Sequence, residues 1–197
     1  MEYKMKNIID ITTKEEVKIT KGDLPILVHG KDHSGASLLS ITIAALFHKA
    51  GNKLCIFTAY PMAKEEFLKQ VEDPENVFLI EDKKNIEKAS DFQTIFVQSG
   101  NIDLFIKTIY NLQDINERII FVKNIETIDV SIFDLINQYS FMVSGDLILN
   151  LINKDFIYFN YSTKILFSPI SNEKILLLEK YQALLKNKLE EKIVSII

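Results

Sequence analysis

Residues 30–37, in the order Gly-Lys-Asp-His-Ser-Gly-Ala-Ser, have the types and spacing of a loop that binds phosphate. Two glycines separated by four residues let the backbone curl, so that successive N–H groups can point at one anion. A helix that starts after the second glycine adds the partial positive charge of its N-terminus. The serines suit a helix start. The candidate phosphate-binding residues here are Gly30, Lys31, Ser34, Gly35, Ala36 and Ser37.

The elements around this loop have the pattern of a strand, a helix and a second strand. Residues 26–28 are a short apolar run, and residues 35–50 carry apolar side chains at helical spacing. Gly51 stands where the end of a helix favours a residue with positive φ, and residues 53–58 begin the next strand. We therefore predict a βαβ unit in which residues 30–37 form the first connection.

This stretch of about thirty-five residues resembles the Walker A region of the RecA-like P-loop NTPases. Gly30, Gly35 and Ser37 match the family pattern, but Ala36 stands where the family has its lysine. The family also ends a core strand with an acid that holds Mg²⁺. If residues 94–97 form that strand, the acid position holds Gln98; if residues 118–122 do, it holds Lys123, followed by Asn124. The resemblance thus implies a degenerate Walker A, no recognisable Walker B acid and no catalytic residue.

One residue supports the opposite interpretation. Lys31 directly follows Gly30, and it matches the signature lysine in the deviant Walker A of ParA- and MinD-type ATPases. Lys31 or Lys123 would then offset part of the positive charge lost at Ala36. No cofactor is assigned, but ATP or GTP with Mg²⁺ stays open, and Lys123 and Asn124 join the candidate binding residues.

Along the chain, apolar strands alternate with helices, which is typical of a parallel sheet covered on both faces. The predicted helices cover residues 35–50, 61–71, 102–112 and 130–138, and further strands cover 77–80, 94–97, 118–122 and 141–143. We expect one domain over residues 1–197: a three-layer α/β/α fold with a mostly parallel central sheet and RecA-like topology. An extra β-hairpin is predicted from residues 156–161 and 164–167. A long C-terminal helix over residues 171–197 is predicted as an element for interaction.

Side chains that follow the predicted strands should meet at one edge of the sheet, where parallel sheets bind ligands. Besides residues 30–37 these are Thr58, Tyr60, Gln98, Ser99, Lys123, Asn124, Glu126, Ser144 and Asp146. His29, His33 and His48 lack ligand spacing with any cysteine or second histidine, so no metal site is predicted.

Composition limits the class of protein. The chain has 197 residues, of which 47% are hydrophobic and 25% charged, as in an ordinary globular domain. A net charge of −4 argues against nucleic-acid binding through a general basic field, although a local basic patch stays open. One cysteine, no secretory leader and no apolar window of about 20 residues indicate a cytoplasmic protein without a membrane span.

The leading hypothesis is a catalytically inactive RecA-like P-loop ATPase homologue that serves as a non-catalytic binding or assembly subunit. Its partner would be a protein, such as an active ATPase subunit, or a second copy of the chain. The first alternative is a protein that binds ATP or GTP, or a weak NTPase, using Lys31 in place of the absent lysine. The second is a DNA-associated accessory factor, which rests on analogy of fold alone.

Overall fold

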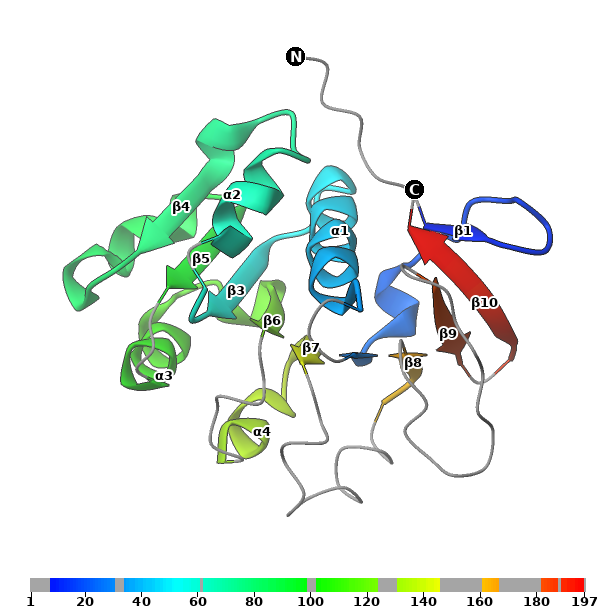
Figure 1. Cartoon of the computed structure of the whole chain (residues 1–197). Helices are drawn as coiled ribbons and strands as arrows, with labels where there is room; N and C mark the ends of the chain where they lie inside the picture. The colour runs from blue at the N-terminus through cyan, green and yellow to red at the C-terminus, as the bar shows by residue number, and fades with distance from the viewer. Residues whose placement is uncertain are drawn as a thin grey trace.

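A ten-stranded mixed sheet forms the centre of the molecule (Figure 1). The computed structural model describes residues 8–30, 34–60, 62–98, 102–123, 131–145, 161–166, 182–187 and 189–196. From one edge to the other, the strands are β1 (Ile8–Asp10), β10 (Glu191–Ile196), β9 (Gln182–Lys186), β8 (Thr163–Leu166), β2 (Ile26–His29), β7 (Ser140–Gly145), β6 (Ile119–Lys123), β3 (Leu54–Thr58), β5 (Thr94–Gln98) and β4 (Val77–Ile80). All neighbours from β8 to β4 pair in parallel, whereas β8–β9, β9–β10 and β10–β1 pair antiparallel.

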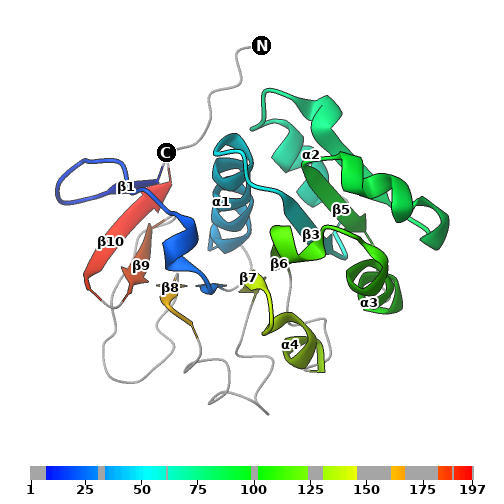
Figure 2. The same ribbon diagram turned by 180° about the vertical axis from the view of Figure 1, so that it is seen from behind.

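Helices cover both faces of the sheet, as Figures 1 and 2 show from opposite sides. The helices are α1 (Ala36–Lys49), α2 (Met62–Leu68), α3 (Ile102–Asn111) and α4 (Ser131–Ile136), with short 3-10 turns at Lys21–Asp23, Pro74–Asn76, Lys83–Asn85, Glu87–Asp91 and Ile115–Glu117. Alternate residues of β3 belong to opposite cores: Ile56 packs with the α1 and α2 side, and Phe57 with the α3 side. The predicted three-layer α/β/α architecture with a mostly parallel sheet is therefore confirmed.

The predicted β2–α1–β3 unit forms as expected. Gly35 precedes α1 with φ 101°, and Gly51 follows the helix with φ 79°, so both occupy the left-handed region that favours glycine. Ile26, Leu27 and Val28 are fully buried between the two helical layers. This burial holds the end of β2 and the start of α1 in a fixed relation.

Arg118 fixes the amino ends of three central strands, β3, β5 and β6. Its buried guanidinium donates hydrogen bonds to the carbonyls of Leu54, Phe92 and Gln93, and it also pairs with Asp114 at 2.8 Å. Burial raises the pKa of Asp114, but hydrogen bonds from Arg118 and Lys53 lower it more, so the carboxyl titrates below its ordinary value. These contacts lock β3, β5 and β6 in register at their amino ends.

The predicted C-terminal helix is wrong wherever the structure describes that segment. Residues 182–186 and 191–196 form the antiparallel strands β9 and β10, while residues 171–181 lie outside the described residues. Burial alternates along β9, with Ala183 and Leu185 inside. At the turn, the Asn187 side-chain oxygen accepts hydrogen bonds from the N–H groups of Leu189 and Glu190, both at 2.9 Å. Pairing of β10 with β1 and β9 satisfies its backbone without a helix.

The hairpin predicted from residues 156–161 and 164–167 is wrong for the part that the structure describes. Lys164–Leu166 pair with β2 on one side and with β9 on the other, so they have no edge left for residues 156–161. Residues 156–160 themselves lie outside the described residues. The extra β-hairpin of this sheet is formed by β9 and β10.

Candidate functional site

The candidate site lies at the carboxyl edge of the parallel strands, where β2 leads towards α1. In the sheet, β7 separates β2 from β6, and β3 separates β6 from β5. The end of β6 is therefore much closer to the start of α1 than the end of β5. Of the two side chains predicted for the acid position, this order selects Lys123, and it leaves Gln98 on a distant strand.

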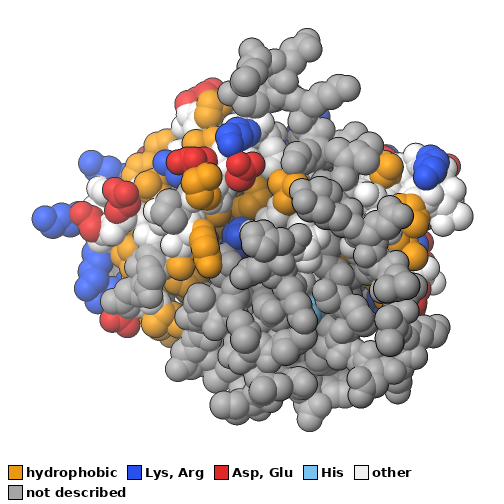
Figure 3. Space-filling model, in the orientation of Figure 1, with side chains coloured by type: hydrophobic (Ala, Val, Ile, Leu, Met, Phe, Trp, Pro, Cys, Tyr) orange, Lys and Arg blue, Asp and Glu red, His pale blue; other side chains and the backbone are white. Residues whose placement is uncertain are grey.

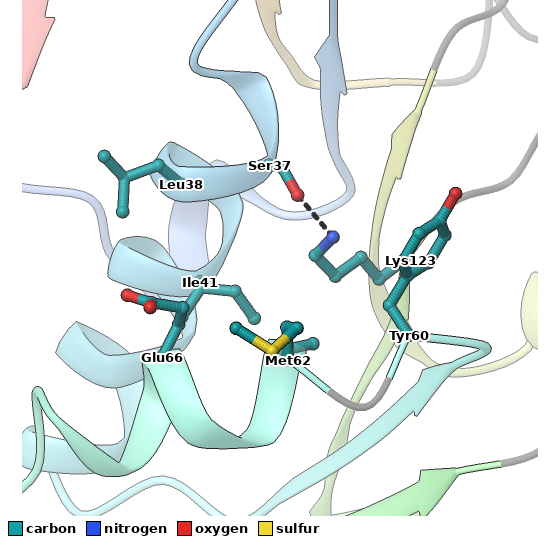
Figure 4. A pocket seen from close by; sticks show the side chains of 8 residues that line it. Ser37, Leu38, Ile41, Tyr60, Met62, Glu66 and Lys123 are labelled. Carbon is teal, nitrogen blue, oxygen red and sulfur yellow. Dashed lines mark hydrogen bonds between the residues drawn. The ribbon is translucent and has the colours of Figure 1, made fainter. Parts of the chain in front are cut away.

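Lys123 makes the central contact of the site. Its ammonium group donates a hydrogen bond to the Ser37 hydroxyl in the first turn of α1 (Figure 4). The same group lies 5.5 Å from the centroid of the Tyr60 ring, which follows β3. With 5% exposure, Lys123 is almost fully buried. Three elements that are remote in sequence thus converge on one cation.

The start of α1 is held by its own serines and by Gly35. The Ser34 hydroxyl accepts a hydrogen bond from the Ala36 N–H at 3.3 Å, and the Ser40 hydroxyl donates to the Ser37 carbonyl at 2.9 Å. Among the predicted site residues, the structure brings Ser37 and Lys123 into contact and places Ser34, Gly35 and Ala36 beside them along the chain. Gly30 directly follows β2. Lys31 and Asn124 lie outside the described residues, so their roles stay predictions.

A pocket of about 290 Å³ opens beside this contact, between α1 and α2, and we call it the α1–α2 pocket. Figure 4 shows Ile41 of α1 and Met62 of α2 facing each other across it. Its lining comprises Ser37, Leu38, Ile41, Tyr60, Met62, Ala63, Glu66 and Lys123. Sequence reasoning named Ser37, Tyr60 and Lys123 but missed the α2 residues, because helical spacing predicts α2 without indicating which helix it faces.

Acidic and nucleophilic chemistry is sparse around the pocket. Glu66 is the one carboxylate among the described lining residues, and it pairs with Lys69 at 2.8 Å. No group of three or more potential metal ligands occurs in the part of the chain that the structure describes. Cys55 is completely buried, which raises the pKa of its thiol to about 12, so it is no nucleophile near neutral pH.

His48 has a structural role rather than a place in this site. Its ring nitrogens bind the Thr94 hydroxyl at 2.7 Å and the Asp73 carboxylate at 2.8 Å. Partial burial raises the pKa of Asp73, but hydrogen bonds from Asn76 and His48 lower it by more. The net pKa of Asp73 therefore lies below its ordinary value. His48 thereby ties α1 to β5 and to the segment before β4.

No protein-family model matches this chain, and no curated protein sequence matches it. Solved structures do match in fold. The genome packaging NTPase B204 of Sulfolobus turreted icosahedral virus 2, solved with AMP, is 14% identical with a TM-score of 0.61, covering 90% of this chain and 98% of B204. The cytoplasmic domain of the type VII secretion ATPase EccC from Thermomonospora curvata is 14% identical with a TM-score of 0.65; the match covers 97% of this chain but 26% of EccC.

A third match is the pCW3 conjugation coupling protein TcpA, solved with ATPγS. It is 11% identical with a TM-score of 0.54, and the match covers 98% of this chain and 66% of TcpA. Identities this low establish the fold alone. The chain therefore has the P-loop NTPase fold. Separately, none of its described helices is long and apolar enough to cross a bilayer.

Proposed function

We propose that this protein is a P-loop NTPase homologue that does not hydrolyse nucleotide and that serves as a binding or assembly subunit. Its partner would be another protein, such as an active ATPase subunit, or a second copy of the chain. The observation that carries the proposal is the hydrogen bond from the Lys123 ammonium to the Ser37 hydroxyl.

In a P-loop hydrolase, the hydroxyl at the Ser37 position binds Mg²⁺, and an acid at the end of a nearby strand helps to hold that ion. Here the end of β6 presents a cation to the same hydroxyl. An ammonium group carries one charge and donates hydrogen bonds, but it cannot coordinate oxygen ligands octahedrally as Mg²⁺ does. The geometry therefore favours a site without the metal that hydrolysis requires.

Ala36 supports the same conclusion. In the P-loop pattern, the lysine after the second glycine reaches the β- and γ-phosphates, and a methyl group at Ala36 offers them no charge. A degenerate Walker A at Ala36 and a lysine in place of the Walker B acid are both consistent with loss of turnover.

A second candidate function is nucleotide binding without turnover, and the same contact favours it. Lys123 places a positive charge at the start of α1, where phosphates of a nucleotide would lie, so it is a better placed substitute for the lost lysine than sequence alone indicated. Among the proteins of similar fold, B204 was solved with AMP and TcpA with ATPγS.

Turnover measurements test the leading proposal. Purified protein is incubated with ATP or GTP and Mg²⁺, beside a Ser37→Ala variant prepared in the same way. We expect equal phosphate release from both, because a contaminating ATPase would contribute equally to each preparation. Turnover in the wild type that the Ser37→Ala variant lacks would refute the proposal.

A further inference from the structure

Tyr60 is an exposed aromatic residue whose backbone is held on both sides. It follows β3, and 49% of its surface is exposed. Its N–H donates a hydrogen bond to the Thr58 hydroxyl at 3.1 Å, and its carbonyl accepts one from the Ala63 N–H in the first turn of α2 at 3.2 Å. Thr58 is completely buried in β3. The position of the Tyr60 backbone is therefore set by β3 and α2.

The Tyr60 ring lies against the Lys123 ammonium. The distance of 5.5 Å from the nitrogen to the ring centroid is within the range of a cation–π interaction. Figure 4 shows the ring beside the Lys123 side chain, whose ammonium group is directed at the Ser37 hydroxyl. The contact thus joins a nearly buried cation to a ring that reaches the surface.

Much of the surface around this contact is apolar. The apolar lining of the α1–α2 pocket comprises Leu38, Ile41, Met62 and Ala63. Figure 3 shows hydrophobic side chains gathered on the face that carries α1 and α2. A cation–π interaction is stronger where the cation is shielded from water. The ring is therefore placed where it contributes to holding the ammonium group.

We propose that Tyr60 is a positioning residue: its ring keeps the Lys123 ammonium on the Ser37 hydroxyl, so that the site selects a phosphate-bearing ligand without Mg²⁺. The hydroxyl at the Ser37 position of a P-loop enzyme binds Mg²⁺, so an ammonium group held on this oxygen competes with that ion. Lys123 must leave the oxygen before the ion can bind, and its departure breaks the contact with the ring. A cation–π contact changes a binding constant by about 2- to 30-fold, and this factor is the contribution assigned to Tyr60. The inference rests on the second candidate function above, nucleotide binding without turnover.

The first test needs no nucleotide, so its failure is distinct from failure of the proposed function. A lysine ammonium that is hydrogen-bonded and shielded exchanges its protons slowly and gives a proton–nitrogen NMR signal, which the Lys123→Ala variant assigns by its loss. Tyr60→Phe keeps the ring and should keep this signal. Pentafluorophenylalanine in place of Tyr60 keeps the shape of the ring but reverses the charge of its face, so the signal should broaden or disappear. A wild type without the signal, or a signal that pentafluorophenylalanine leaves unchanged, would overturn the proposal.

The second test measures the dissociation constant of ATP in Mg²⁺ divided by that in EDTA. This ratio should fall about 2- to 30-fold in Tyr60→Leu and should stay near the wild-type value in Tyr60→Phe. Tyr110→Leu is the matched control, since Tyr110 is 71% exposed on α3, on the other side of the sheet from the α1–α2 pocket. Circular dichroism confirms that each variant is folded. An unchanged ratio in Tyr60→Leu, an equal fall in Tyr60→Phe or Tyr110→Leu, or a failure of ATP to bind any variant would overturn the proposal, whereas the absence of phosphate release is measured separately.

Discussion

Magnesium should weaken the binding of ATP to this protein, whereas it strengthens binding in an ordinary P-loop enzyme. The reason is the hydrogen bond that the Ser37 hydroxyl already accepts from Lys123. A Mg²⁺ ion would bind this oxygen at about 2.1 Å, and the Lys123 ammonium already donates a hydrogen bond to it. At the usual length of a charge-assisted hydrogen bond, about 2.8 Å, two cations on the same oxygen would lie about 4 Å apart.

The repulsion between them is large. A charge of two and a charge of one at about 4 Å repel by about 8 kcal/mol at the effective dielectric of a protein surface, and by about 2 kcal/mol in bulk water. Displacing Lys123 is the alternative. That movement breaks a charge-assisted hydrogen bond, worth about 1.5–3 kcal/mol, and the contact with the Tyr60 ring, worth about 0.5–2 kcal/mol.

Displacing Lys123 therefore costs less free energy than holding both cations on the Ser37 hydroxyl. This displacement sets the free-energy penalty for Mg²⁺ binding at about 2–5 kcal/mol. This corresponds to a loss of affinity between about 30-fold and several thousand-fold. Replacing Lys123 with alanine removes the penalty together with the cation. In the Lys123→Ala variant, Mg²⁺ should then raise the affinity for ATP.

Isothermal titration calorimetry of ATP, in excess EDTA and again in excess Mg²⁺, measures how Mg²⁺ changes the affinity of the wild type and of the Lys123→Ala variant for ATP. Lys49→Ala is the matched control, because it removes the same charge from the exposed last residue of α1, about 18 Å from Ser37. Its response to Mg²⁺ should equal that of the wild type. Stronger binding of ATP to the wild type in Mg²⁺ than in EDTA would refute this reasoning. So would an absence of ATP binding to every variant at millimolar concentrations, because phosphates would then not bind at this edge of the sheet.

Three further predictions concern the scaffold. Arg118→Met should lower the free energy of unfolding by about 3–5 kcal/mol in urea titrations, because Asp114 then keeps only Lys53 as a cationic partner and the carbonyls of Leu54, Phe92 and Gln93 lose the donor that Arg118 supplies. Unchanged stability would contradict the structural role of Arg118. The pKa of Asp114 is lowered in the folded protein, so its contribution to stability is present above its ordinary pKa of about 4 and is lost as pH falls through the lowered value. Urea titrations of Asp114→Asn should accordingly show a shallower loss in acid than the wild type, and the exposed Asp91→Asn should behave like the wild type. Cys55, with its thiol pKa raised to about 12, should resist a thiol reagent at mild alkaline pH until the protein is unfolded, and rapid labelling of the native state would show that the strand opens.

The central fold was predictable because its signals are local. The strand Val77–Ile80 has the predicted bounds, and Gly51 has the predicted positive φ. Buried parallel strands are continuous apolar runs, and a glycine at a helix end is set by the adjacent turn. Each of these features depends on a few neighbouring residues.

The C-terminal segment was mispredicted because its deciding contacts are remote. Leu185 and Leu189 are four residues apart, which fits one face of a helix. In the structure, Leu185 is buried in β9, whereas Leu189 projects from a turn. What makes this segment a hairpin is pairing with β8 on one side and β1 on the other, and no local pattern reports those partners.

The candidate site likewise combines features that are local in the sequence with contacts between remote residues. Gly35 and Ser37 were identified by their spacing along one loop, and Lys123 by its position after an apolar strand. Their contact joins residues 86 positions apart, and it depends on a strand order that leaves only β7 between β2 and β6. The α2 wall of the pocket depends on how Met62 and Glu66 face α1, which periodicity does not determine.

In the proposed function, the position of Lys123 explains how the site would bind an anion without hydrolysing it. An ordinary P-loop gathers positive charge from a lysine in the loop and from a metal ion, and the metal neutralises the charge that develops on the transferred phosphoryl group. In this protein the charge comes from β6, on a side chain that is held between Ser37 and Tyr60. Such a group can balance part of the charge of an anion at the start of α1, but it orients no water and supplies no acceptor for a proton. If the proposed loss of turnover is correct, phosphate release from ATP should appear only when Ala36→Lys and Lys123→Asp are combined, because either change alone leaves one of the two cations absent or misplaced.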